Sequence, residues 1–184
     1  MGFSIGAMFH RVAKKFVRRS DMSALEAGVK APDFTLSTMS GEKFSLSDAL
    51  VKGPVLLVFF KISCPVCQFS MPFAERLFQA AKGKKVTIVA VSQDDQKATA
   101  AFMKQYGLTL PIALDDTKTY PASNAYGLTT VPNFFLVNPS GEIAIASAGW
   151  SREEVESTYR SLMADTKPSS FFRADEQVPE LKYG

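Results

Sequence analysis

The 184-residue sequence is poor in the residues that build metal centres and disulfide frameworks. It contains two cysteines, Cys64 and Cys67, and a single histidine, His10. A structural zinc site usually needs four Cys or His ligands, and a framework of disulfides needs more than one pair of cysteines. We therefore expect no metal site, no other cofactor and no fold that depends on several disulfides.

Long apolar runs and a strong charge of one sign are also missing. No stretch reaches the roughly 20 consecutive apolar residues that a membrane-spanning helix needs. The net charge is only +3, with 21 Lys and Arg against 18 Asp and Glu, so we expect no nucleic-acid partner. Hydrophobic residues make up 46% of the chain, which suits one soluble domain with a core of ordinary size.

Residues 1–30 form a basic segment. Its basic residues follow a short apolar stretch instead of preceding it, which is the wrong order for a secretory signal. We therefore expect a cytoplasmic protein, in which a transient catalytic disulfide is more plausible than a structural one. The apolar residues fall at helical spacing, with the basic residues largely off that stripe: Ile5, Met8, Phe9, Val12, Phe16 and Val17 against Arg11, Lys14, Lys15, Arg18 and Arg19. This amphipathic arm either packs on its own domain or makes peripheral contact with a membrane or a partner.

Strand and helix patterns alternate after residue 30. The sequence predicts strands at 33–36, 43–45, 55–60, 86–91, 111–114, 133–137 and 143–146, with helices at 64–81, 95–106, 119–126 and from 151. The first two strands form a hairpin around Ser40-Gly41. This order predicts an α/β sandwich around a mixed sheet of five to seven strands, with a domain over 31–166 and an irregular tail over 167–184.

The segment Cys64-Pro65-Val66-Cys67 stands between a buried strand and a helix. Two intervening residues in the first helical turn keep the two sulfurs within bonding reach. The free N–H groups and the dipole of the helix N-terminus favour a thiolate on Cys64. Cys67 lies one turn further along and is expected to be more buried. We therefore predict that Cys64 attacks the disulfide of a partner and that Cys67 resolves the mixed disulfide.

Over residues 31–165 the sequence resembles the thioredoxin-like redoxins of the TlpA and alkyl hydroperoxide reductase/thiol-specific antioxidant (AhpC/TSA) group. The resemblance is carried by residues 31–36, 64–67, 126–132 and 134–141, which read APDFTL, CPVC, YGLTTVP and FFLVNPSG. It implies a thioredoxin-like three-layer α/β sandwich, with an N-terminal β-hairpin and a central αβ insertion in the mixed sheet. It also implies thiol–disulfide exchange with protein partners, supported by an upstream thiol electron donor.

The resemblance further assigns roles around the two cysteines. In the family the proline that matches Pro132 is cis and lies against the cysteine pair, and the preceding residue offers its backbone to the partner chain. The catalytic candidates are therefore Cys64, Cys67 and Pro132, and the substrate-contacting candidates are Val131, Pro65 and Val66. A simpler alternative is that Pro132 only begins an edge strand.

Three positions depart from the family pattern. Val58, Ser63 and Ser70 stand where many relatives carry an Asp or Asn, a Trp and a Glu, respectively. The usual proton acceptor for the buried thiol is therefore not evident. Lys61 either lowers the thiol pKa through its charge or is simply solvated at a strand end. Glu75 is expected to lie too far along the helix to help.

Two other functions compete with disulfide exchange. A peroxiredoxin-like peroxidase, with an antioxidant function, would use the pattern Pro-x-x-x-Thr/Ser-x-x-Cys. Counting back from Cys67 gives Cys64 and Phe60, and counting back from Cys64 gives Lys61 and Leu57, so neither cysteine fits. The third possibility is a non-catalytic thioredoxin-like binding module that docks through its basic arm. The sequence specifies neither the partner, nor the direction of electron flow, nor the oligomeric state.

Overall fold

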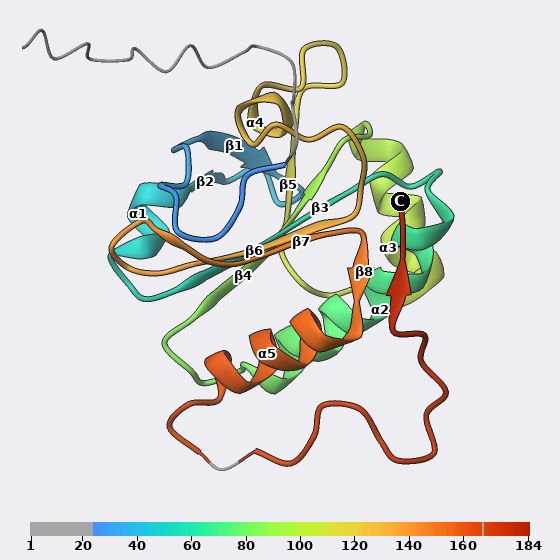
Figure 1. Cartoon of the computed structure of the whole chain (residues 1–184). Coiled ribbons are helices and arrows are strands. Elements are labelled where there is room, and N and C mark those ends of the chain that lie inside the picture. The colour runs from blue at the N-terminus through green and yellow to red at the C-terminus, as the bar shows by residue number, and fades with distance from the viewer. Residues whose placement is uncertain (1–23, 167) are drawn as a thin grey trace, which may run out of the picture.

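A computed structural model describes residues 24–166 and 168–184. Their main feature is a mixed seven-stranded sheet in the order β2-β1-β5-β4-β3-β6-β7, with helices on both faces (Figure 1). The elements are β1 Thr35–Thr38, β2 Lys43–Ser45, α1 Leu46–Leu50, β3 Val55–Phe60, α2 Pro65–Ala80, β4 Thr87–Ser92, α3 Gln96–Tyr106, β5 Ile112–Leu114, α4 Pro121–Ala125, β6 Asn133–Val137, β7 Ile143–Ala148, β8 Trp150–Ser151, α5 Arg152–Leu162 and β9 Leu181–Lys182. This confirms the predicted α/β sandwich and its N-terminal hairpin.

Strand β3 lies at the centre of the core and leads directly to the first cysteine. All six of its side chains are fully buried, because neighbouring strands flank it and helices cover both faces of the sheet. It runs parallel to β4 and antiparallel to β6. A continuous apolar run is what such a strand requires. Its last residue, Phe60, places the loop 61–64 at the edge of the sheet where β3 and β4 both end.

Helix α2 begins immediately after Cys64, which serves as its N-cap. Pro65 occupies the first turn, where a missing N–H is tolerated because it has no intrahelical partner. The helix runs on to Ala80 with Pro72 inside it, and the kink that the sequence predicts at Pro72 stays a prediction. Its core-facing side chains recur every three or four residues, which turns Cys67 toward the sheet: Cys67, Ser70, Met71, Ala74 and Leu77.

The N-terminal boundary of the domain lies earlier than expected. Leu25 N–H donates to the Tyr126 carbonyl at 3.1 Å, and Gly28 N–H donates to the Ile143 carbonyl at 2.8 Å. Residues 24–30, assigned to the arm from the sequence, are therefore held on the domain. The predicted amphipathic helix falls within residues 1–23, outside the described residues.

The C-terminal segment, expected as an irregular tail, is packed against the domain. Residues 168–184 have little regular structure, yet Phe171 and Phe172 are only 7% and 4% exposed. Arg76 on α2 forms a bidentate ion pair with Glu176, with N–O distances of 3.1 and 3.2 Å. The chain then returns beside β8, where β9 pairs with it in an antiparallel two-stranded sheet (Figure 1). Packing against the domain therefore continues well beyond residue 166.

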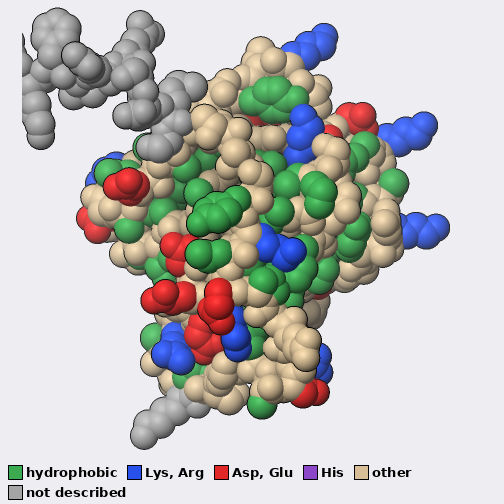
Figure 2. Space-filling model, turned by 45° about the vertical axis from the view of Figure 1, so that its right-hand side comes forward, with side chains coloured by type: hydrophobic (Ala, Val, Ile, Leu, Met, Phe, Trp, Pro, Cys, Tyr) green, Lys and Arg blue, Asp and Glu red, His purple; other side chains and the backbone are tan. Residues whose placement is uncertain are grey.

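Charged side chains of both signs are interspersed with hydrophobic ones on the face that Figure 2 shows. None of the helices within residues 24–166 and 168–184 combines the length and apolar composition needed to cross a bilayer. Over the same residues, no three His, Cys, Asp or Glu side chains gather as metal ligands would.

Candidate active site

The two cysteines lie at the junction of the β3–α2 loop and the first turn of α2. Both are free thiols; Cys64 is half-buried and Cys67 is fully buried. The Cys64 sulfur accepts a hydrogen bond from the backbone N–H of Cys67 at 3.3 Å and donates its own proton to the Val131 carbonyl at 3.2 Å. The geometry thus presents Cys64 toward the surface and keeps Cys67 behind it.

Burial raises the pKa of the Cys67 thiol well above its ordinary value. A backbone hydrogen bond with Lys61 partly opposes this rise, whereas the neighbouring Cys64 and the charge of Asp94 add to it. Cys67 is therefore protonated at neutral pH, because desolvation penalises its thiolate. Any reaction of Cys67 has to begin with the loss of that proton.

The Val131–Pro132 peptide bond is cis and lies against Cys64. Val131 is 9% exposed, and the Pro132 carbonyl accepts a hydrogen bond from Gly149 N–H at 2.8 Å. Strand β6 begins at Asn133 and lies between β3 and β7, so it is an interior strand. The alternative that Pro132 begins an edge strand is therefore wrong.

The other two candidate residues lie in the first turn of α2. Pro65 is exposed and Val66 is half-buried, and both adjoin Cys64 in the chain. Their positions bring them to the surface around the outer thiol. Contact of Pro65 and Val66 with a partner stays a prediction.

The positions that depart from the family pattern do not supply a carboxylate. Val58 is buried in β3, Ser63 is exposed, and the buried Ser70 hydroxyl donates to the Cys67 carbonyl at 3.3 Å. The Glu75 carboxylate accepts hydrogen bonds from the backbone N–H groups of Thr109 and Leu110 at 2.7 and 2.9 Å. Glu75 thus binds the loop before β5, in agreement with the expectation that it does not serve Cys67.

Asp94 is the acidic residue that sequence reasoning missed. Its carboxylate accepts a hydrogen bond from Ile62 N–H at 2.8 Å, in the loop that leads to Cys64. Phe60 and Ser92 are paired in the parallel β3–β4 ladder, so Ile62 and Asp94 each follow two residues beyond that pair. Since parallel strands end at the same edge of a sheet, the strand register could have placed Asp94 beside this loop.

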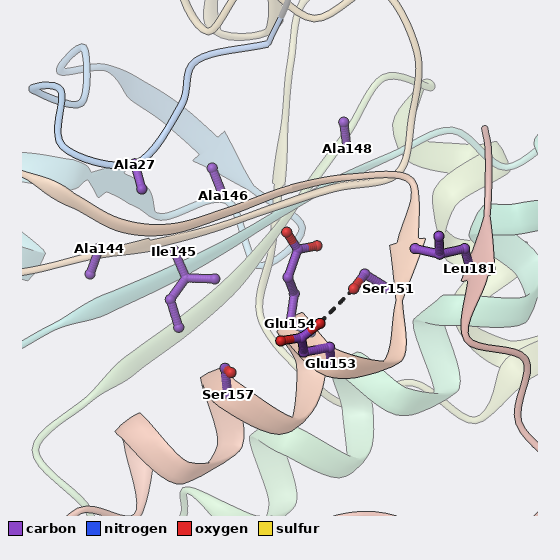
Figure 3. Close-up of a pocket in the computed structure, with 10 residues that line it drawn as sticks. All are labelled: Ala27, Ala144, Ile145, Ala146, Ala148, Ser151, Glu153, Glu154, Ser157 and Leu181. Carbon is purple, nitrogen blue, oxygen red and sulfur yellow. Dashed lines mark hydrogen bonds between the residues drawn. The ribbon is translucent and has the colours of Figure 1, made fainter.

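Two hollows differ in their distance from the thiols. The larger one, about 560 Å³, lies between β7 and α5 and is lined by side chains that include Ile145, Glu153, Glu154 and Leu181 (Figure 3). The Glu154 N–H there donates to the Ser151 hydroxyl at 3.2 Å, which caps α5. A smaller hollow of about 310 Å³ is lined by Val131 itself together with Lys61, Gln93, Tyr120, Ser123, Asn124, Leu128, Thr129 and Thr130. Only the lining of the smaller hollow includes a residue bonded to Cys64.

Known proteins resemble this chain in sequence and in fold. The model of the AhpC/TSA family matches residues 27–146. The thiol-disulfide oxidoreductase ResA of Halalkalibacterium halodurans is 33% identical over 145 residues, covering 78% of this chain and 81% of the relative. The ResA of Bacillus subtilis is 32% identical over 141 residues, covering 76% and 77%.

Among solved structures, the thioredoxin domain of a thiol-disulfide oxidoreductase from Bacteroides vulgatus matches with a TM-score of 0.66 at 23% identity, covering 75% of this chain and 98% of that one. This likeness confirms the predicted thioredoxin-like fold. The relatives confirm the predicted redoxin group and the enzyme class, thiol–disulfide oxidoreductase. With its family model spanning most of the domain, the chain belongs to the AhpC/TSA family.

Proposed function

We propose that this protein exchanges disulfides with protein partners through the Cys64–Cys67 dithiol, acting as a reductant of the partner. One observation carries the proposal: an accessible sulfur and a buried sulfur share the first turn of α2, with the Val131 carbonyl bonded to the accessible one. The two sulfurs therefore differ in exposure, as a nucleophile and a resolving thiol must.

The first step uses the Cys64 thiolate. The helix N-terminus and the Cys67 N–H stabilise its charge. The thiolate attacks one sulfur of the partner disulfide, so that a Cys64–partner bond forms and the partner S–S bond breaks. The second partner sulfur leaves as a thiolate and takes a proton from solvent.

The second step uses Cys67. Its thiol loses the proton that burial retains, and the new thiolate attacks the Cys64 sulfur. A Cys64–Cys67 disulfide forms, and the mixed disulfide breaks. The Cys67 proton passes to solvent and the released partner thiolate takes one up, so the partner leaves with two thiols. The partner gains two electrons and the protein loses two, which an upstream thiol donor then restores.

A partner chain would lie against the backbone at Val131, with Pro132, Pro65 and Val66 around the outer thiol. Addition of an extended segment to exposed backbone groups is a common way to bind a peptide. The cis peptide at Val131–Pro132 and its contact with Cys64 support this placement.

Covalent trapping tests the proposal. The Cys67→Ser protein should accumulate mixed disulfides with a protein whose cysteines are all in disulfides, such as insulin. Cys64 attacks a disulfide of this substrate, and no second thiol is present to resolve the mixed disulfide. The Cys64→Ser protein is the matched control and should trap little, since its remaining thiol is buried. Equal trapping by both variants on non-reducing gels would refute the assigned roles.

A peroxide assay separates the peroxidase alternative. The Thr/Ser position of the peroxidatic pattern is occupied by Cys64 or Lys61, so neither cysteine has the hydroxyl donor that the pattern provides. Such a site needs donors aimed at the peroxide oxygens. We expect the reduced protein to react with hydrogen peroxide no faster than an ordinary thiolate. Stopped-flow oxidation orders of magnitude faster, confined to one cysteine, would favour the peroxidase instead.

A further inference from the structure

Gly184 lies on the surface at Val131 and Pro132 where a partner chain is proposed to bind. A Cβ atom on Gly184 would overlap the carbonyl of Val131 and come within 3.3 Å of the Pro132 nitrogen. The same Val131 carbonyl accepts the hydrogen bond from the Cys64 thiol. The last residue therefore lies directly beside the group that contacts the reactive sulfur.

Lys182 and Tyr183, which precede Gly184, pass close to the backbone of Gly149. Gly149 has a φ of +84°, and a Cβ atom built on it would lie 2.5 Å from the Lys182 carbonyl oxygen and 3.4 Å from the Tyr183 Cα. The backbone can approach so closely only because this residue has no side chain. Since Gly149 N–H is bonded to the Pro132 carbonyl, the proline and the glycine form one continuous surface under residues 182–184.

The segment is firmly held further back along the chain. Phe171 and Phe172 are buried, with their ring centres 6.5 and 5.8 Å from that of Phe73 on α2. The buried Trp150 donates its indole N–H to the Pro179 carbonyl at 2.8 Å. These contacts fix the chain up to residue 179 against the domain.

Residues 181–184, which follow this segment, are held much less firmly. Only two residue pairs join β9 to β8, and all of residues 181–184 are exposed. Leu181 and Tyr183 are 57% and 83% exposed, so they bury little apolar surface. A segment with few buried contacts can open locally while its base stays in place.

We propose that residues 181–184 form a displaceable strap over the partner-docking surface made by Val131, Pro132 and Gly149. This proposal rests on the proposed function and adds a regulation of the same site. In the free protein the strap occupies the surface, and a partner gains access to Cys64 when an extended segment of its own chain displaces residues 181–184. The partner must be an extended polypeptide, because the surface already accommodates a chain backbone beside Val131 and Gly149.

Shortening the chain to end at Glu180 tests the proposal, because this removes the strap and leaves its base. The rate constant for reducing insulin should rise about three- to tenfold, as expected if a few hydrogen bonds keep most molecules closed. Iodoacetamide is small and needs no docking surface, so it should alkylate Cys64 at nearly the same rate in both proteins. Tyr183→Ala is the matched control: it keeps the strap backbone and removes an exposed side chain, so the wild-type rate should remain.

A full-length variant distinguishes loss of the strap from an effect of truncation on folding. Gly184→Ala introduces the Cβ atom that would overlap the Val131 carbonyl, and it should raise the insulin rate in the same direction. The backbone amide NMR signals of Val131 and Gly149 should shift when residues 181–184 are removed. Exchange at equal or lower rates in the shortened protein, or unchanged amide signals, would overturn the strap alone. Absence of disulfide exchange in both proteins would instead refute the proposed function, and the strap proposal with it.

Discussion

Replacing Phe171 with alanine should destabilise the whole domain, although the residue lies in a segment with little regular structure. The side chain is 7% exposed, and its ring centre lies 5.0 Å from that of Phe172 and 5.2 Å from that of Tyr159. The Arg76 guanidinium covers it at 4.3 Å from the ring centre. Removing a buried phenyl group costs about 3–5 kcal/mol. Because one side of this ring meets a partly exposed arginine, we expect about 3 kcal/mol, which lowers the melting temperature by about 6–12 °C.

Urea unfolding measures this loss. Trp150 is the only tryptophan in the chain, and its fluorescence can be followed together with far-UV circular dichroism. The two probes should give the same midpoint and an unchanged m value, as a two-state transition requires. Tyr183→Ala, which removes an 83% exposed aromatic ring, should change stability by less than about 0.5 kcal/mol. A similarly small loss for Phe171→Ala would refute the conclusion that the C-terminal segment is packed against the domain.

Two further predictions concern the cysteines and α2. Iodoacetamide should label Cys64 much faster than Cys67 at neutral pH, because Cys67 is fully buried and burial raises the pKa of its thiol. Peptide mapping after partial labelling measures the ratio of labelled Cys64 to labelled Cys67. Preferential labelling of Cys67 would reverse the assigned roles. Glu75→Gln should lose stability at neutral pH and match the wild type in acid. Although burial raises the pKa of Glu75, hydrogen bonds from Thr109, among others, lower it below its ordinary value of 4.5. The stabilisation is therefore present above that value and lost as the pH falls through the folded-state pKa. Thermal unfolding as a function of pH measures it, and a constant difference between the two proteins would contradict this reasoning.

The centre of the fold could be predicted because its signals are local. Six consecutive apolar residues predict the buried strand β3, and the structure has it over the same residues, Val55–Phe60. The start of α2 could be placed because a helix N-terminus has a recognisable pattern, with Pro65 in the first turn. These two elements together determine where Cys64 and Cys67 lie. The assignment of their chemical roles stays a prediction until the thiols are tested.

The C-terminal segment could not be predicted in the same way, because its partners are remote in sequence. Phe171 and Phe172 are an isolated aromatic pair without helical or strand periodicity, and their surroundings are polar. The Arg76–Glu176 ion pair joins residues 100 positions apart. No local pattern reports such contacts, so a polar segment that contains prolines resembles a free tail. The predicted role of the arm and the predicted cytoplasmic location stay predictions.

Helix α2 joins the redox site to the C-terminal segment. Its first turn carries Cys64 and Cys67, and two residues further along the ring centre of Phe69 lies 4.9 Å from that of Trp150. The Lys182 ammonium group lies 5.1 Å from the centre of the same Phe69 ring. A partner that displaces residues 181–184 therefore also uncovers the surface of α2 next to the thiols. Because one helix positions both the cysteines and the aromatic base of the strap, partner docking and access to Cys64 are linked by direct packing and need no separate regulatory site.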